Sequence, residues 1–151
     1  MADFAGAKAA IRQRLVDLWT ATPIAFQNEK PEGEWPPVDA DGFASDAWVL
    51  LEVEATRSAM RGAGSPGQQI WVDEGFIYVH VFVPTGSGDQ MASQHATAIG
   101  ELFRGAVFYR ETPGCYVRTW APRIDGGGSG DDNGNWFRIT MSVPFEYWHL
   151  G

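Results

Sequence analysis

Residues 68–105, QQIWVDEGFIYVHVFVPTGSGDQMASQHATAIGELFRG, contain the stretch that decides the fold class. Residues 76–83 (FIYVHVFV) carry no charged side chain and predict a β-strand. Residues 68–72 predict a shorter strand, with a turn at residues 73–75 joining the two. Both faces of residues 76–83 are largely apolar, so we expect this strand to be central and covered on both sides.

A helix is predicted after this strand, over residues 89–104. Pro84 and the glycines that follow it end the strand, and Ser87 and Gln90 have the spacing of a capping box. Side chains at helical spacing form the stripe that we expect to be buried: Met91, His95, Ile99, Leu102 and Phe103. Gly105 is suited to end the helix, because glycine readily adopts the left-handed conformation found at that position.

Regular patterns recur in the rest of the chain. Residues 2–19 have apolar side chains at steps of three and four and predict an amphipathic helix that ends before Pro23. Strands are predicted at residues 24–27, 48–55, 115–120 and 136–143. Pro144 indicates an edge or a bend after the last strand. We expect the aromatic tail, residues 145–150, to pack against the protein, because untied chain ends fray.

Three segments are expected to be loops. Residues 28–46 contain three prolines, two glycines and six acidic residues, and are too broken for a helix or strand. Residues 57–67 read as a flexible connection. Residues 125–135 contain no apolar side chain and predict the long tip of a hairpin between two antiparallel strands.

This order of elements predicts the α+β class. We expect an antiparallel or mixed sheet of about five strands with two helices packed on one face. At 151 residues, the chain is expected to form a single domain, residues 1–151, with long loops at residues 28–46 and 125–135.

Charge and composition exclude several classes of protein. The net charge is −8 and no basic stripe exists, which argues against tight binding of nucleic acid. The single cysteine, Cys115, excludes an internal disulfide framework and a cysteine-based zinc site. No apolar run approaches the roughly 20 residues of a membrane span, and the N-terminus lacks the apolar core of a secretion signal. We therefore expect no membrane partner and synthesis in a reducing cytoplasm.

The sequence lacks the common catalytic motifs. Gly86 and Gly88 precede a helix, but the third glycine of the dinucleotide fingerprint is replaced by Met91. Ser65 and Ser129 each lack one glycine of the nucleophile elbow. The glycine-rich run over residues 126–134 and the aspartates before Phe43 match calcium motifs incompletely. We predict no cofactor and no metal site.

The isolated candidates for acid–base chemistry are two histidines and two glutamates. His80 and His95 could meet in space, but a buried histidine with satisfied hydrogen bonds explains each of them better. Glu52 and Glu54 share a strand face, where carboxylates are more often solvated or paired with arginine than catalytic. We therefore predict no catalytic residue and no enzyme.

Five segments, taken in order, resemble the tail terminator proteins of long non-contractile-tailed phages and gene-transfer agents. They are residues 19–26 (WTATPIAF), 48–53 (WVLLEV), 78–88 (YVHVFVPTGSG), 102–105 (LFRG) and 136–145 (WFRITMSVPF). Each segment alone is a weak signal, and their order and the total length carry the resemblance over nearly the whole chain.

The resemblance implies a small α+β subunit of a six-membered ring. Such a ring caps the finished tail tube, ends tube polymerisation and offers a surface to the neck of the head. The implied partners are further copies of the chain, the tail tube protein and a neck or head-completion protein. DNA passes through the ring without specific binding, in keeping with an acidic lumen that repels phosphate. The implied place is the tail–neck junction of the virion, after synthesis in the host cytoplasm.

Ring subunits meet head-to-tail, so two different patches of the chain have to fit together. We predict these patches in residues 28–46 and 145–150. Their large aromatic residues are the candidate anchors, because buried aromatic residues dominate interface energies: Trp35, Phe43, Tyr147 and Trp148.

Three other functions stay open. A neck or head-completion (head–tail connector) protein is the nearest, and its loss would leave tails of normal length. A small protein-binding module outside any virus would be a stable monomer with a partner. An enzyme would need a cleft that joins His80 or His95 to a carboxylate.

Overall fold

The computed structural model of the chain describes residues 2–31, 33, 35–37, 47–130 and 134–151. The elements are α1 (Phe4–Leu18), β1 (Ile24–Phe26), β2 (Trp48–Gly62), β3 (Ile70–Pro84), α2 (Gln90–Phe103), β4 (Val107–Phe108), β5 (Tyr116–Thr119), β6 (Arg123–Ile124), β7 (Gly128–Ser129) and β8 (Trp136–Leu150). Neither of the described helices is long and apolar enough to cross a membrane.

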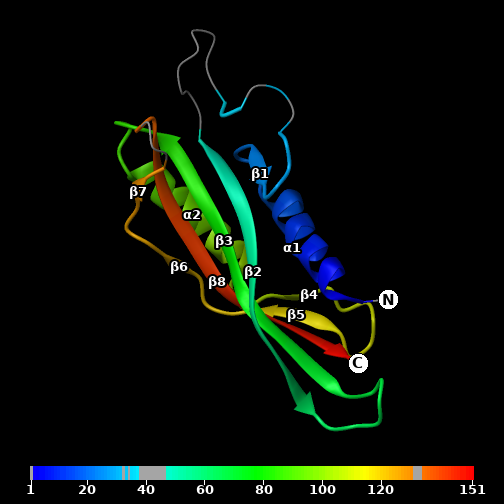
Figure 1. Cartoon of the computed structure of the whole chain (residues 1–151). Coiled ribbons are helices and arrows are strands. Elements are labelled where there is room, and N and C mark those ends of the chain that lie inside the picture. The colour runs from blue at the N-terminus through cyan, green and yellow to red at the C-terminus, as the bar shows by residue number, and fades with distance from the viewer. Residues whose placement is uncertain (1, 32, 34, 38–46, 131–133) are drawn as a thin grey trace.

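The strands form one mixed sheet, which confirms the α+β class (Figure 1). Its order is β1-β2-β3-β8-β5-β4, and the short strands β6 and β7 also pair with β8. Only the β1–β2 pair is parallel among the described pairs. The sheet has eight strands rather than about five, because the chain pairs in two-residue pieces at β4, β6 and β7.

β3 is one continuous strand, so the predicted turn at residues 73–75 is wrong. The hairpin instead joins β2 to β3, and β2 extends through most of the predicted flexible loop over residues 57–67. Gly75 lies opposite Ala55, beside a register shift between Ala55 and Arg57 that marks a β-bulge. A Cβ at Gly75 would collide with the Glu54 carbonyl oxygen, so glycine is needed there for close approach of the two backbones.

β8 is also continuous, so the predicted bend at Pro144 is wrong, although on one side residues 143–144 have no strand partner among the described pairs, between those of β5 and β6. The Pro144 carbonyl accepts the Trp120 N–H at 3.0 Å, and the Trp120 carbonyl accepts the Gly105 N–H at 3.2 Å. An N–H group at position 144 would face the Trp120 carbonyl, and this carbonyl already accepts a hydrogen bond from Gly105. Proline removes no ladder hydrogen bond at this place, although it lies inside a paired strand.

Both helices contribute to one hydrophobic core with the same side of the sheet. Ile11 and Leu15 of α1 and Ile99 and Phe103 of α2 are fully buried there, as is Val79 of β3. Figure 1 shows α2 running along the sheet behind β3 and β8. The buried side chains fit the helical period and the strand alternation that define the core in the sequence.

The stripe predicted for α2 is only partly correct. Ile99 and Phe103 are buried, but Met91 is 54% exposed and Ala92 and Ala96 take the inner positions. Small residues at these positions let the helix pack closely on the sheet. The predicted capping box is absent too: Asp89 is the N-cap, its side chain makes no cap hydrogen bond, and the Ser87 hydroxyl donates to the Pro84 carbonyl.

The predicted hairpin over the glycine-rich segment is observed in outline. β6 and β7 run antiparallel to β8 and lead into the tip of this hairpin. The loop predicted over residues 125–135 therefore includes a two-residue strand, β7. In the segment 28–46, the described residues contain no helix or strand.

Candidate interaction surface

The side of the sheet away from the helices forms the surface that we call the open face. Side chains that alternate with the core positions of the long strands and β5 point to it. They include Trp48, Glu52 and Glu54 of β2; Phe76, Tyr78, His80 and Phe82 of β3; Trp136, Arg138, Thr140, Glu146 and Trp148 of β8; and Tyr116 and Arg118 of β5. We expected residues 76–83 to be covered on both sides. This is correct only for Phe82 at the end of the strand, because both described helices pack on the opposite face and Phe76 is 36% exposed.

Aromatic side chains cover one end of the open face. The Trp48 ring stacks on Phe82 at 4.1 Å between centroids and meets Trp136 edge-on at 5.8 Å. Trp35 packs edge-on against Trp48 at 5.2 Å. These aromatic residues form a hydrophobic cluster that is separate from the main core. The cluster covers the end of the sheet where β2 begins and β3 ends.

A hydrogen-bonded histidine lies in the middle of the open face. His80 Nε2 is 2.8 Å from a Glu52 carboxylate oxygen, and His80 Nδ1 is 2.7 Å from the Thr140 hydroxyl. His80 Nε2–H donates to the Glu52 carboxylate, and His80 Nδ1 shares a hydrogen bond with the Thr140 hydroxyl. Such contacts tie β2 and β8 together across β3.

An enzyme would need a cleft that joins a histidine to a carboxylate. His80 does contact a carboxylate, that of Glu52. His80 does not line any of four depressions found on the surface of the described residues. His80 and His95 do not meet, because α2 packs on the other side of the sheet. His95 instead contacts the Trp19 ring at 5.3 Å, and burial lowers the pKa of His95.

The β5 side of the open face combines arginine with aromatic rings. Tyr116 stacks on Trp148 at 5.9 Å, and the Arg118 guanidinium lies over the Trp120 ring at 4.9 Å. Trp120 is 44% exposed, which is unusual for so large a ring. A depression of about 250 Å³ lies beside these residues, lined by Val107, Arg110, Tyr116 and Arg118.

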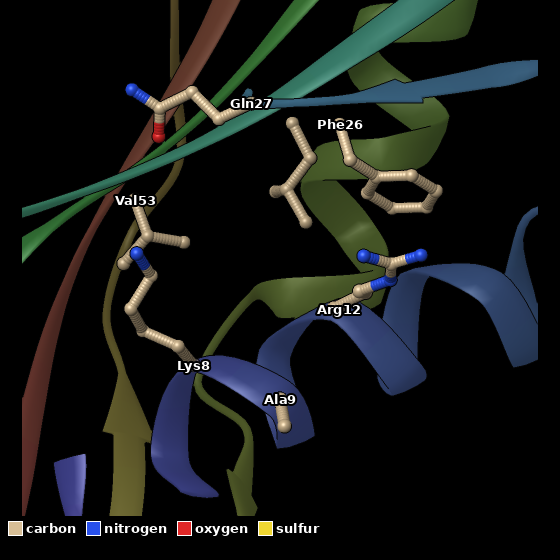
Figure 2. Close-up of a pocket in the computed structure, with 7 residues that line it drawn as sticks. Lys8, Ala9, Arg12, Phe26, Gln27 and Val53 are labelled. Atoms are coloured by element: carbon tan, nitrogen blue, oxygen red, sulfur yellow. The ribbon is translucent and has the colours of Figure 1, made fainter. Parts of the chain in front are cut away.

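A second depression, of about 280 Å³, lies between α1, β1 and β2 (Figure 2). Its lining is Lys8, Ala9, Arg12, Phe26, Gln27, Leu51 and Val53. The Arg12 guanidinium lies 3.7 Å from the Phe26 ring centroid and donates two hydrogen bonds to the Glu29 carboxylate. Those hydrogen bonds lower the pKa of Glu29. Arg12 is thus already engaged within the chain, and the depression is a small amphipathic groove.

Two further depressions have glycine or proline in their lining. One, of about 630 Å³, lies between the start of α2 and the β7–β8 hairpin, and includes Gly86, Gly88 and Gly134. Asp89 also lines it, and its negative charge disfavours a phosphate there. The other, of about 280 Å³, lies beside β1 and includes Pro31 and Trp35.

The four predicted anchors have different places in the structure. Tyr147 is 1% exposed and belongs to the main core, so its prediction as a surface anchor is wrong. Trp148, the next residue of the strand, lies half-buried on the open face. Trp35 packs against the protein's own aromatic cluster, and Phe43 lies outside the described residues.

The prediction from sequence missed the residues at the β5 edge. Tyr116, Arg118 and Trp120 alternate in the segment CYVRTW, with buried Val117 and Thr119 between them. Period-two alternation is the signal that could have separated this face from the core. Among the described residues, no group of three His, Cys, Asp or Glu side chains is placed to hold a metal ion.

Comparison with known proteins identifies the fold and no activity. No protein-family model and no curated protein matches the chain. Among the solved protein chains that match, one whose name states no activity has a TM-score of 0.67 and 23% sequence identity to this chain. The match covers 97% of this chain and 96% of the other, so the similarity in fold extends over nearly the full length of both. Because the identity is low, this likeness shows the fold alone.

Proposed function

We propose that the chain is a structural virion protein that forms a ring at the end of a phage or gene-transfer-agent tail. The ring caps the tail tube, ends its polymerisation and provides the attachment surface for the head or neck. The proposal starts from the ordered sequence resemblance over nearly the whole chain. The observation that carries it in three dimensions is the open face, a long sheet surface without a helix over it among the described elements.

The exposed side chains of this face suit contact with protein. Phe76 is 36% exposed, Val107 39% and Trp120 44%, and arginines and carboxylates lie among them. Exposed apolar patches with a polar rim are typical of protein interfaces, where aromatic residues and arginine are enriched. A structural subunit uses such a surface to contact its own copies, the tail tube protein and the neck protein.

The charge of the chain fits a ring around passing DNA. The net charge is −8, and like charge keeps phosphate from binding to the wall of a channel. In this proposal the ring is a hexamer at the tail–neck junction, assembled in the host cytoplasm, and DNA passes through it without specific contacts.

The deciding experiment is the tail-length distribution, by electron microscopy, of particles produced without this chain. Overlong tubes without heads are expected, because nothing would stop tube growth. Tails of normal length that fail to join heads would overturn the terminator role and favour a neck or head-completion protein. Normal infectious particles would remove the chain from tail assembly.

A further inference from the structure

The open face carries opposite charges at its two edges. One patch, the acidic edge, consists of Glu52 and Glu54 on β2. The other, the arginine groove, is the depression of about 250 Å³ lined by Val107, Arg110, Tyr116 and Arg118 at β4 and β5. β2 and β4–β5 lie towards opposite ends of the strand order, so the two patches are separated by β3 and β8.

The acidic edge is accessible. β1 pairs with β2 only over residues 49–51, so from Glu52 onward the outer edge of β2 has no strand partner among the described residues. The Glu52 side chain is 39% exposed although one of its carboxylate oxygens contacts His80 Nε2 at 2.8 Å, and Glu54 is exposed. The pKa of Tyr78 is raised by burial, then by its hydrogen bond to Glu54 and by the charges of Glu54 and Glu52. Arg57 follows on the same strand, beyond the bulge.

The arginine groove offers two cations that have no ion-pair partner among the described residues, although one of them, Arg118, lies over the Trp120 ring. Arg110 and Arg118 are exposed, and neither forms an ion pair with a described residue. Glu146 lies opposite Arg118 in the strand register, but its carboxylate accepts the Trp148 indole N–H at 2.9 Å. Glu111 is adjacent to Arg110 in the chain. The exposed Val107 and Trp120 add apolar surface beside the two arginines.

We propose that the acidic edge of one copy of the chain binds the arginine groove of the next copy. Arginine is suited to this contact, because its planar group binds carboxylates through two parallel hydrogen bonds. Because the two patches differ, the contact can be made head-to-tail, with the acidic edge of each copy in the groove of the next, and such contacts can close into a ring. This inference rests on the proposed function, since it assigns the contact between subunits of that ring.

A second copy is the occupant that the charges favour. Each copy has a net charge of −8, so two copies repel one another unless local charges of opposite sign meet. The arginine groove supplies such charges beside exposed apolar side chains, and the acidic edge supplies their counterpart on the same chain. Complementary charges of this kind set the register and orientation of an interface.

The test uses two charge reversals that are complementary to each other. Arg110→Glu with Arg118→Glu makes the groove acidic, and Glu52→Arg with Glu54→Arg makes the edge basic. Each double variant alone would then oppose like charges, whereas a mixture of the two restores both contacts in alternating order. A chain with all four substitutions has a basic edge and an acidic groove, so the two patches are again complementary in charge. Sedimentation velocity and native mass spectrometry of the purified full chain give the oligomeric state.

We expect the wild-type chain to associate and each double variant to do so at least about tenfold more weakly, or about 1.4 kcal/mol. The equimolar mixture and the fourfold variant are expected to regain association. Arg104→Glu with Arg123→Glu is the matched control for the arginine variant, because it changes the net charge by the same amount at exposed positions outside the groove. Circular dichroism verifies folding, and the glutamine substitutions at the same four positions replace any charge reversal that fails to fold.

Three results would overturn the inference. One is equal association of the wild type and both double variants, and another is failure of the mixture to regain it. The third is a wild-type chain that stays monomeric at every concentration. None of these results bears on the tail-length distribution, which judges the proposed function separately. If particles without the chain have overlong tails and the charge variants associate as the wild type does, the proposed function stands. The contact between subunits would then involve other residues.

Discussion

At the scale of single residues, Tyr147 shows how strand alternation decides a role. Its side chain is 1% exposed in the core, whereas that of Trp148 lies on the open face. The Tyr147 hydroxyl is buried and makes no hydrogen bond to a described residue. Leaving a buried hydroxyl unpaired costs about 1–3 kcal/mol, so the ring of Tyr147 stabilises the core while its oxygen opposes that effect.

We expect Tyr147→Phe to leave the free energy of unfolding unchanged at pH 7 or to raise it by about 1 kcal/mol. Urea denaturation measures this. Tyr109→Phe is the matched control, because the Tyr109 hydroxyl accepts the Asp3 N–H at 3.4 Å and its loss removes a contact. A larger loss of stability in Tyr147→Phe than in the control would contradict the unpaired state of the Tyr147 hydroxyl.

The same variant is expected to change the response to alkali. Burial, followed by the influence of Cys115 and other neighbours, raises the pKa of Tyr147 to about 12. An unfolded tyrosine has a pKa of about 10. The raised pKa therefore stabilises the fold below pH 10, and this contribution is lost as the pH rises towards 12, by up to about 1.4 kcal/mol per pH unit. Stability should fall less steeply over this window in Tyr147→Phe than in the wild type.

At the scale of elements, the two helices begin differently. The Asp3 side chain accepts the Gly6 N–H at 2.7 Å and caps α1, whereas Asp89 at the start of α2 makes no side-chain cap hydrogen bond. An N-cap side chain satisfies one of the four free N–H groups of a first turn. The stability of α1 should therefore depend on its cap more than that of α2.

The matched pair Asp3→Ala and Asp89→Ala tests this difference. We expect Asp3→Ala to lower the free energy of unfolding by about 1 kcal/mol, and Asp89→Ala to have a much smaller effect. Equilibrium denaturation followed by far-UV circular dichroism measures both. Equal losses in the two variants would mean that the side-chain hydrogen bond of Asp3 contributes little.

At the scale of the whole molecule, the sheet is unevenly supported. β3 pairs with β2 on one side and with β8 on the other along its length. β2 has β1 beside it only over residues 49–51, and most of its side chains beyond Val53 are exposed. Central strands open only with the whole fold, whereas edge segments with little buried surface open locally.

Hydrogen exchange of the dilute chain should follow this pattern. We expect peptides within residues 76–83 to be the slowest to exchange, and peptides within residues 54–62 to exchange much faster. Mass spectrometry after timed deuteration resolves these segments. Equal protection of both segments in a monomeric sample would show that the outer edge of β2 is covered by another part of the chain.

Much of the fold could be predicted from the sequence because local periods are strong in it. Alternation placed Ile77, Val79 and Val81 on the core side, and helical spacing placed Ile11 and Leu15 there. These periods follow from backbone geometry and need no knowledge of neighbouring strands. The sequence by itself therefore determined the α+β class and most of the buried side chains of the long strands.

Only the tertiary structure decided where the strands end and what faces outward. Gly75 acts as part of a bulge because the Glu54 backbone approaches it, and Pro144 fits inside a strand because Gly105 already occupies the facing carbonyl. His80 meets Glu52 and Thr140 through the registers of two strand pairs. Each of these facts depends on a residue far away in the chain. A local pattern determines the side of a strand on which a residue lies, whereas its partners follow from the register in which distant segments pair.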